Sequence, residues 1–431
     1  MDTSGETIAA IATAPGRGGV AVIRVSGPAA RTIAERLTGA PLGAASVALR
    51  AIHQPDDTKV LLDRGLLVQF HAPHSYTGED VVEFQVHGGR VTPRRILEAC
   101  CAAGARLARR GEFTERAFLN GRLTYEQAEG VLDLVNAKTD RAADAALAGL
   151  EGRRQRELRK LYATALAISS ELEHALDVSE DELPAEFLPA IRARLTALVA
   201  ALGAAVRDAR EGRLLREGAL VVLAGPPNAG KSSLMNALLG ESRVIVSATP
   251  GTTRDSVEEG LAIAGWPIRL VDTAGLRETG DAIEGAGVVR ARELIEQAEV
   301  VIELTPAAAE PVKSETASAS RIAVTSKCDL QRGPGLNVST KTGEGLEELK
   351  RAIVMALETR AAAIDEAAGG DEATAVIVRV RAALAAAAEL TDPVLLANAV
   401  RSAADELGRL VGATYSEDLL TALFSRFCVG K

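Results

Sequence analysis

The chain has 431 residues, of which 47% are apolar and 25% are charged, values that are ordinary for a soluble globular protein. This length accommodates two or three domains, each with a core of its own. A formal net charge of −9 argues against a uniformly basic nucleic-acid binder. Aromatic residues make up only 3% of the chain, so alanine, leucine and valine must build the cores, which favours closely packed helices.

The cysteines and the apolar runs exclude further classes of protein. Cys100, Cys101, Cys328 and Cys428 have no metal-ligand spacing, and a disulfide framework is not expected in a chain of this size. No apolar run approaches the length of about 18 residues that a membrane span needs, and the N-terminus lacks the pattern of a signal peptide. We therefore expect a cytoplasmic protein without a membrane partner.

Residues 1–122 alternate strand and helix signals, which predicts an α+β domain. Strands are predicted for residues 7–12, 20–25, 66–70 and 81–87, and helices for residues 29–37 and 93–103. The segment PGRGG at residues 15–19 resembles a phosphate loop. No helix pattern follows it, so a hairpin turn is favoured there.

The next part of the chain has the pattern of long helices, with leucine, isoleucine and valine on one face. Pro184 and Pro189 interrupt this pattern, and a helical pattern returns near the C-terminus, over residues 374–426. The economical interpretation is one helical domain that an inserted domain interrupts. The predicted parts are residues 123–216 and 360–431 for the helical domain and residues 217–359 for the insertion.

The segment GPPNAGKSS at residues 225–233 lies between a short apolar run and apolar residues at helical spacing. Strand, glycine loop and helix is the context in which G-x-x-x-x-G-K-[ST] binds phosphate, through loop N–H groups and the N-terminus of the helix. Lys231 is expected to reach the β- and γ-phosphates, and Ser232 to ligate Mg²⁺. The alternative is a chance glycine turn between a core strand and a core helix.

Four further motifs follow this loop in the order found in GTPases. They are TPGTTRD at residues 249–255, DTAG at 272–275, SKCD at 326–329 and VSTK at 338–341. Thr253 is expected to be the second protein ligand of Mg²⁺, and Asp272 to hold the ion through water. The Asp329 carboxylate can accept both N–H donors of a guanine edge, a pair that adenine lacks. These motifs together predict a Ras-like P-loop GTPase domain.

The residues expected to contact GTP come from all five motifs. They are Asn228, Ala229, Gly230, Lys231, Ser232, Ser233, Ser247, Ala248, Thr249, Pro250, Gly251, Thr252, Thr253, Asp272, Thr273, Ala274, Gly275, Ser326, Lys327, Cys328, Asp329, Ser339, Thr340 and Lys341.

Two basic clusters contrast with the acidic total. Residues 90–122 carry eight arginines and three glutamates, a local excess of five positive charges. The second cluster consists of Arg153, Arg154, Arg156, Arg159 and Lys160 on a predicted helix. On charge alone a solvated surface is favoured, and an RNA phosphate contact surface is the sharper alternative.

Distinctive sequence blocks extend along the whole chain. They are TIAAIATAPGRGGVAVIRVSGP at residues 7–28, SYTGEDVVEFQVHGG at 75–89, GEFTERAFLNGRLTYEQAE at 111–129, the central GTPase motifs, and SEDLLTALFSRFCVGK at 416–431. Together these blocks resemble the MnmE (TrmE) family of tRNA-modifying GTPases. Other GTPases share only the central motifs, so the resemblance is specific. It implies a multidomain α/β protein with an N-terminal α+β folate-binding domain, an α-helical central domain and an inserted Ras-like P-loop GTPase domain.

The resemblance also implies chemistry and partners. The N-terminal domains would form a homodimer, and the FAD-containing MnmG (GidA) would join it in a heterotetramer or larger complex. With tRNA as substrate, these proteins would add a (carboxymethyl)aminomethyl group at C5 of wobble uridine 34. The one-carbon unit would come from 5-formyl- or 5,10-methylene-tetrahydrofolate, and GTP, Mg²⁺ and K⁺ are the other implied cofactors.

The resemblance assigns roles in GTP hydrolysis as well. Leu276 follows DTAG where Ras-like enzymes carry a water-orienting glutamine, and the family position for that role matches Glu284. A K⁺ ion would take the place of an arginine finger, held by Asn228 together with Ser247, Thr249 and Thr252. Without the resemblance, Glu284 is simply an exposed loop charge.

The folate-binding positions of the family match Arg24, Glu83, Arg122 and Lys431. A carboxylate such as Glu83 can pair with the guanidine-like edge of a pterin, and arginines can meet the glutamate-tail carboxylates. Cys428 matches the family's C-terminal cysteine, whose thiolate would lie near the folate. The alternatives are surface ion pairs for Arg24, Glu83 and Arg122, and a small buried residue for Cys428.

One departure and two other functions stay open. Ser326 stands where most GTPases carry asparagine before Lys-x-Asp, which weakens or changes one contact to the base. A ribosome-assembly or signalling GTPase without modification chemistry is the second hypothesis. A folate enzyme that GTP merely regulates is the third, and it predicts activity without MnmG.

Overall fold

A computed structural model describes residues 5–43, 46–55, 57–176, 184–242, 258–273, 284–306, 320–363, 372–412 and 417–431. Contacts between Cα atoms divide the chain into two compact units. The first unit comprises residues 1–132, 150–152 and 414–431, and the second comprises residues 133–149 and 153–413. Several predicted site residues lie outside the described residues: Ser247, Ala248, Thr249, Pro250, Gly251, Thr252, Thr253, Ala274 and Gly275.

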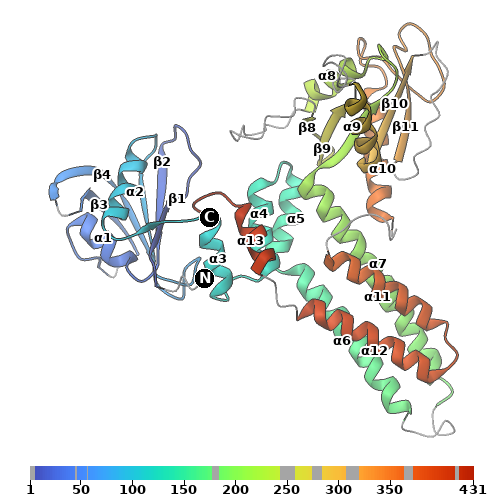
Figure 1. The fold of residues 1–431 in the computed structure, drawn as a ribbon, viewed down its shortest axis with the longest axis horizontal. Helices are drawn as coiled ribbons and strands as arrows, with labels where there is room; N and C mark the ends of the chain where they lie inside the picture. Colours follow the sequence, from blue (N-terminus) through green and yellow to red (C-terminus); the bar gives the residue numbers. More distant parts are fainter. Residues whose placement is uncertain are drawn as a thin grey trace. The chain divides into compact units, whose positions relative to one another are not determined.

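The first unit contains a six-stranded sheet of order β3-β4-β5-β2-β1-β6. Its strands are β1 (Ile8–Ile11), β2 (Val20–Ser26), β3 (Val47–Gln54), β4 (Asp57–Phe70), β5 (Val81–His87) and β6 (Arg106–Leu107). All pairs are antiparallel except β1 with β6. Helices α1 (Ala30–Thr38) and α2 (Thr92–Ala102) share one apolar core with the sheet (Figure 1).

The elements predicted for this unit are confirmed, with two strands and one helix missed. The turn at residues 15–19 joins β1 to β2, which pair antiparallel from Ile8 with Ser26 to Ile11 with Ile23. The strand predicted at residues 66–70 is the end of the longer β4. Strand β3 was missed because its apolar side chains do not mark one buried face: Val47 and Leu49 are both exposed.

The C-terminus belongs to the first unit. Helices α3 (Glu112–Leu119) and α13 (Glu417–Ser425) and the part of α4 (Tyr125–Asn136) up to Leu132 lie here, and Phe424 and Phe427 share a buried cluster with Ala128 and Leu132. Beyond α13, the Gly111 amide donates to the carbonyl of Cys428, with N and O 3.4 Å apart. The chain thus returns from residue 414 onward to the unit in which it began.

A buried ionic cluster ties α3 to this unit. The Glu112 carboxylate is fully buried and accepts hydrogen bonds from Arg106, the Arg109 amide and Arg116. Arg116 is 4% exposed and also pairs with Glu79. Arg106, Arg109 and Arg116 of the basic cluster at residues 90–122 are therefore paired within the protein, so the cluster offers less free positive charge than a solvated surface or an RNA contact surface would.

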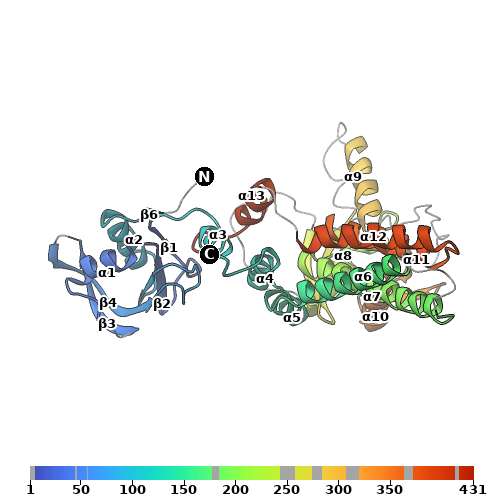
Figure 2. The same cartoon turned by 90° about the horizontal axis from the view of Figure 1, so that it is seen from below.

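The second unit begins with a helical bundle. Its main helices are α6 (Arg153–Leu176), α7 (Phe187–Glu217), α11 (Glu372–Ala388) and α12 (Pro393–Val411), which lie side by side in Figures 1 and 2. Helix α7 is long and apolar enough to cross a membrane by length and composition alone. Its Leu195, Leu198 and Leu202 are buried in the core of the bundle, so it serves as a core helix. Helix α5 (Asp140–Leu150) also belongs to this unit.

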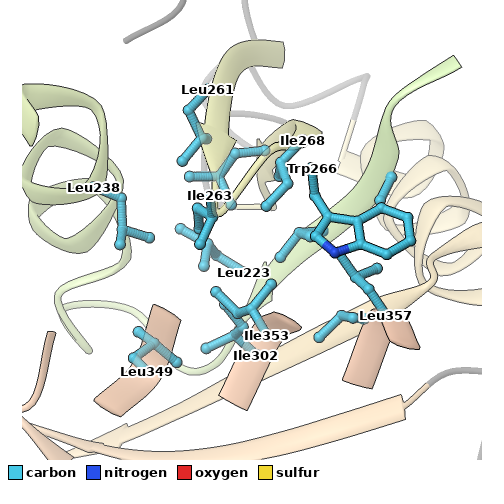
Figure 3. Close-up of a cluster of buried hydrophobic side chains, with 14 of the residues drawn as sticks. Leu223, Leu238, Leu261, Ile263, Trp266, Ile268, Ile302, Leu349, Ile353 and Leu357 are labelled. Atoms are coloured by element: carbon cyan, nitrogen blue, oxygen red, sulfur yellow. The ribbon is translucent and has the colours of Figure 1, made fainter. Parts of the chain in front are cut away.

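The same unit contains a second six-stranded sheet of order β12-β11-β10-β7-β9-β8. Its strands are β7 (Ala219–Ala224), β8 (Glu258–Ile263), β9 (Trp266–Asp272), β10 (Val300–Pro306), β11 (Ser320–Ser326) and β12 (Leu336–Val338). All pairs are parallel except β8 with β9. Helices α8 (Lys231–Ser242), α9 (Glu284–Gln297) and α10 (Leu346–Ala362) complete the domain, and Figure 3 shows its largest apolar cluster.

Removing the Glu112 charge should destabilise the first unit. Burial alone would raise the pKa of this carboxyl, but hydrogen bonds from Arg106 and the Arg109 amide outweigh burial and lower the pKa to about 2. We expect Glu112→Gln to lower the free energy of unfolding at pH 7 by about 3 kcal/mol, measured by denaturant titration of the full chain.

The same substitution has a defined pH dependence. Because the folded pKa of Glu112 lies below its ordinary value of 4.5, its contribution is complete above that pH and is lost as the pH falls toward 2. The gap in stability between the wild-type protein and the variant should therefore narrow below about pH 4.5. An unchanged gap from pH 7 to pH 3 would contradict the role assigned to this carboxylate.

Candidate functional site

The predicted phosphate loop connects β7 to α8. Gly225 has φ +146°, and a Cβ at this position would lie 2.2 Å from the carbonyl oxygen of Leu304, so glycine is required by close backbone approach. Asn228 and Gly230 also have positive φ, at 61° and 90°. These conformations turn the chain directly into α8, whose N-terminus is an anion site.

The Lys231 side chain is already placed across this loop. It is 5% exposed, and its Nζ donates to the carbonyl oxygens of Gly225 and Pro226 at 2.9 Å each. Carbonyl oxygens solvate a buried ammonium only partly, so anionic phosphate oxygens are stronger partners for it. The arrangement fits the predicted role of Lys231 at the phosphates.

Ser232 and Asp272 meet although 40 positions separate them in the sequence. The Ser232 hydroxyl donates to Oδ2 of Asp272 at 2.7 Å, and Asp272 is the last residue of β9. Next to it, the Thr273 hydroxyl donates to the carbonyl of Leu223 at 2.9 Å. A hydroxyl and a carboxylate that converge on one point are hard oxygen donors, which suit Mg²⁺ beside nucleotide phosphates.

Strands β11 and β12 supply the predicted base-binding side. The Ser339 hydroxyl, which is fully buried, donates to Oδ1 of Asp329 at 2.7 Å and so fixes the orientation of that carboxylate. The backbone amide of Lys341 in turn donates to the Ser339 hydroxyl. Lys327 has φ 58°, and its Nζ donates to the Asn228 carbonyl at 3.1 Å, which links the base loop to the phosphate loop.

The described residues that the sequence predicts to contact GTP therefore lie at one edge of the sheet, where β7, β9, β11 and β12 end. They are Asn228, Ala229, Gly230, Lys231, Ser232, Ser233, Asp272, Thr273, Ser326, Lys327, Cys328, Asp329, Ser339, Thr340 and Lys341. Carboxyl ends of parallel strands form the ligand-binding edge of open α/β sheets. Helix α9 begins at Glu284, and the side chain of Glu284 lies outside the described part of the chain.

Ser326 is the unusual residue of this site. Its Oγ is buried and has no hydrogen-bond partner among the described residues. An unpaired buried hydroxyl is uncommon in folded proteins. The serine hydroxyl therefore makes no hydrogen bond to the residues next to it in the Lys327–Asp329 loop. The longer side chain of an asparagine would carry its amide further toward the predicted base site.

The predicted folate residues lie in the first unit: Arg24 on β2, Glu83 on β5, Arg122 between α3 and α4, and Lys431 at the C-terminus. Arg24 and Glu83 face each other across the β2–β5 pair, with Arg24 Nε 2.8 Å from Glu83 Oε1. The guanidinium carbon of Arg24 is 5.6 Å from the ring centroids of both Tyr76 and Phe113. This aromatic support was missed in the sequence, although Tyr76 lies inside one of the blocks that carry the family resemblance.

The C-terminal residue approaches the same place. Burial and the nearby charge of Arg24 lower the pKa of the Lys431 ammonium, and Cys428 interacts with it as well. Gly430 has φ +101°, and a Cβ there would lie 2.4 Å from the carbonyl oxygen of Ile11, so the tail is seated against β1.

The two remaining predicted residues are exposed. Cys428 is exposed, contrary to the alternative of a small buried residue. Arg122 is exposed as well, and its Cγ lies 3.1 Å from the Cβ position of Gly78. The first unit thus brings Arg24, Glu83 and Lys431 together and leaves the thiol of Cys428 accessible.

No group of three or more His, Cys, Asp and Glu side chains in the described part of the chain has the arrangement of a metal site. The Ser232–Asp272 pair fits Mg²⁺ in another way, because in phosphoryl-transfer sites the phosphates and water supply most of the ligands.

The fold and the site define the class: a P-loop GTP-binding domain joined to a helical bundle and an N-terminal α+β unit. Comparison with known proteins gives the family. The family model described as GTP-binding protein TrmE N-terminus matches residues 7–122, and the model described as MnmE helical domain matches residues 126–428. The chain belongs to the MnmE family.

Curated relatives match over the whole chain and carry the name tRNA modification GTPase MnmE. The relative from Symbiobacterium thermophilum is 40% identical and the alignment covers 99% of both chains. The relative from Bordetella petrii is 41% identical with 98% of both chains covered, and that from Akkermansia muciniphila is 39% identical with 99% of both covered.

Ser326→Asn should tighten the binding of guanine nucleotides. The longer amide adds both a donor and an acceptor next to the base loop, and one net hydrogen bond corresponds to roughly a 2- to 12-fold gain in affinity. Titration of the full chain with a fluorescent GDP derivative measures this affinity. Ser326→Ala is the matched control and should bind like the wild-type protein, because the serine hydroxyl has no partner to lose. Weaker GDP binding by Ser326→Asn would show that the space beside Ser326 is needed by the base.

Proposed function

We propose that this chain is a K⁺-activated GTPase that works with an FAD-dependent partner, MnmG, to modify C5 of tRNA wobble uridine 34. The observation that carries the proposal is the assembly of phosphate-, metal- and base-binding loops in a chain that matches its family from end to end. Membership of the MnmE family supports the extension from GTP hydrolysis to the uridine chemistry, K⁺ and MnmG.

In the proposed mechanism, the amides of the phosphate loop and Lys231 hold the β- and γ-phosphates of GTP. Ser232 and Asp272 would hold Mg²⁺ with Thr253, and the bound ion would neutralise charge that develops on the phosphates. Asp329, oriented by Ser339, accepts the N–H edge of guanine.

We assign the activation of water to Glu284, and the binding of K⁺ to the phosphate loop and the segment before β8. Glu284 would orient the attacking water, because Leu276 has no polar group for this task. Asn228, Ser247, Thr249 and Thr252 would hold K⁺, which supplies positive charge where other GTPases use arginine. The exposed position of Asn228 in the phosphate loop supports its part in this proposal.

The N-terminal unit would hold the folate donor, 5-formyl- or 5,10-methylene-tetrahydrofolate. Arg24 fixes the Glu83 carboxylate, which can then accept the N–H edge of the pterin, while Lys431 and Arg122 supply positive charge for its carboxylates. Cys428 is exposed close to Lys431, where a thiol can take part in the transfer.

The exposed face of the β3–β4 pair supports a homodimer. Strand β3 is an edge of its sheet, and Val47, Leu49 and Leu61 are 51%, 71% and 46% exposed. Exposed apolar side chains that gather at a sheet edge favour association with another chain. We propose that this face joins two copies, with MnmG and tRNA completing a cytoplasmic complex.

The alternatives predict different properties of the N-terminal unit. A ribosome-assembly or signalling GTPase has no use for the Arg24–Glu83 pair or for a C-terminal cysteine beside them. A folate enzyme merely regulated by GTP would be active without MnmG, so modification by the purified chain alone would favour that hypothesis.

GTP turnover should depend on K⁺ and on Glu284. We expect turnover of the purified wild-type protein to be at least tenfold faster in KCl than in matched NaCl, since charge stabilisation at the phosphates contributes on this scale. Glu284→Ala should lower turnover at least 100-fold, in the range of a lost general catalyst, with GDP affinity unchanged. If turnover depends neither on the cation nor on Glu284, the hypothesis of a signalling GTPase without modification chemistry would be favoured instead.

Glu83→Gln should separate modification from GTP hydrolysis. Mass analysis of tRNA nucleosides in a strain that carries only this variant should show loss of the wobble-uridine modification, while the purified variant hydrolyses GTP at the wild-type rate. A deletion strain is the reference. Unchanged wobble uridines in the deletion strain would refute the modification function, and full modification by the variant would refute the role of Glu83.

A further inference from the structure

The hairpin formed by β8 and β9 carries the only tryptophan of the chain. Trp266 is fully buried in the apolar cluster of the GTPase domain, together with Leu261, Ile263 and Ile268 of the same hairpin (Figure 3). Its Nε1–H has no hydrogen-bond partner within the described part of the chain. Packing and contacts with the faces of the ring therefore hold the indole in place.

One face of this indole is covered by Arg141, which belongs to α5 and not to the GTPase domain. The guanidinium carbon lies 4.0 Å from the ring centroid, within the range of a cation–π contact. The same guanidinium pairs with Glu211 on α7, with Nη2 of Arg141 2.7 Å from Oε1 of Glu211. The turn residue Gly265 also lies against α5, since its Cβ position is 3.2 Å from Cβ of Arg141.

Apolar contacts strengthen this attachment. Ala142 of α5 and Leu214 and Leu215 of α7 are buried in the same cluster as Trp266. Arg269 of β9 donates to the carbonyl of Gly218, the residue at which α7 ends, with Nε and O 3.3 Å apart. Helices α5 and α7 thus form a platform on which the β8–β9 hairpin rests.

The hairpin joins the two segments that the sequence assigns to GTP hydrolysis. Strand β8 begins at Glu258, shortly after the TPGTTRD segment, and β9 ends at Asp272, which binds the Ser232 hydroxyl. A displacement of the hairpin would therefore move Asp272 relative to the phosphate loop. Rigid positioning of such groups accounts for a large part of enzymatic rate enhancement.

We propose that Arg141 is a positioning residue for GTP hydrolysis: it clamps Trp266, and with it the β8–β9 hairpin, to the platform of α5 and α7. The same clamp couples the nucleotide state of the GTPase domain to the helical bundle. The proposal rests on the proposed GTPase activity. It assigns to an arginine outside the nucleotide site a role that acts through Trp266.

The chemistry of the contact sets the choice of variants. A planar guanidinium stacks on an aromatic ring and bonds a carboxylate at the same time, which a lysine ammonium does less well. Arg141→Met removes both interactions, Arg141→Lys retains the charge, and Glu211→Gln leaves the ring contact in place. Arg194→Met is the matched control, because Arg194 on α7 pairs with Glu171 on α6 in a similar way. The side chains of Arg194 and Glu171 are 40% and 46% exposed, and those of Arg141 and Glu211 are 35% and 38% exposed.

The experiment compares the kcat and KM for GTP, the affinity for GDP, and the emission of Trp266 with GDP and with a non-hydrolysable GTP analogue. We expect Arg141→Met to lower kcat about fivefold or more, within the range of coupling that residues remote from a ligand can carry. GDP affinity should stay within twofold of the wild-type value. The difference in Trp266 emission between the two nucleotides should shrink, Arg141→Lys should be intermediate, and Arg194→Met should behave like the wild-type protein.

Each outcome has a defined meaning. A kcat for Arg141→Met within twofold of wild type, or an equal loss in Arg194→Met, would overturn the proposal. If circular dichroism shows that Arg141→Met does not fold, Glu211→Gln and Arg141→Lys replace it. A kcat within twofold of wild type in both of these variants, with an unchanged nucleotide response of Trp266 emission, would then overturn the proposal. Absence of turnover in the wild-type protein would refute the proposed function, and the nucleotide response of Trp266 emission would then decide on the clamp alone.

Discussion

The parallel pairing of β7 with β9 and β10 is the constraint on which the nucleotide site depends. Because these strands run in the same direction, the phosphate loop after β7 and Asp272 at the end of β9 meet at one edge. The pairing also brings the Leu304 carbonyl against Gly225, where no side chain fits. Sheet register, rather than local sequence, therefore sets the distance between Ser232 and Asp272.

Much of this site could be predicted because its parts are local. The phosphate loop has glycines where φ is positive, a lysine and a serine at the start of a helix, and an apolar strand before it. The fully buried Ser339 and its bond to Asp329 could not be predicted as a contact, since it depends on the pairing of β11 with β12. The unpaired hydroxyl of Ser326 is likewise a property of packing, although its departure from the common motif was visible.

In the first unit, sequence patterns predict fewer of the structural features. Strands β2 and β5 were predicted because buried residues alternate along them, and β1 because it is a short buried apolar run, whereas β3 was missed because Val47 and Leu49 are exposed at an edge. The arginine-rich stretch is a clearer case. A sum of charges along the sequence treats every arginine as exposed, whereas Arg106 and Arg116 pair with the fully buried Glu112. Net local charge therefore overstates the positive surface wherever a carboxylate lies buried among arginines.

The insertion of the GTPase domain into the helical chain explains why a contact such as Arg141–Trp266 matters. The chain connects this domain to α7 at two points: Gly218 ends α7, and the carbonyl of Ala363, after α10, accepts a hydrogen bond from Arg210 of α7. Chain connections at two points do not by themselves fix the orientation of a domain, so contacts away from them contribute to it. Arg141 on α5 supplies a contact of this kind, and it does so at the hairpin that links the two nucleotide-responsive segments. The apolar contacts of Ala142, Leu214 and Leu215 hold the hairpin without direction, whereas the guanidinium of Arg141 must lie over the indole and reach Glu211 at the same time, so it also fixes the orientation of the hairpin.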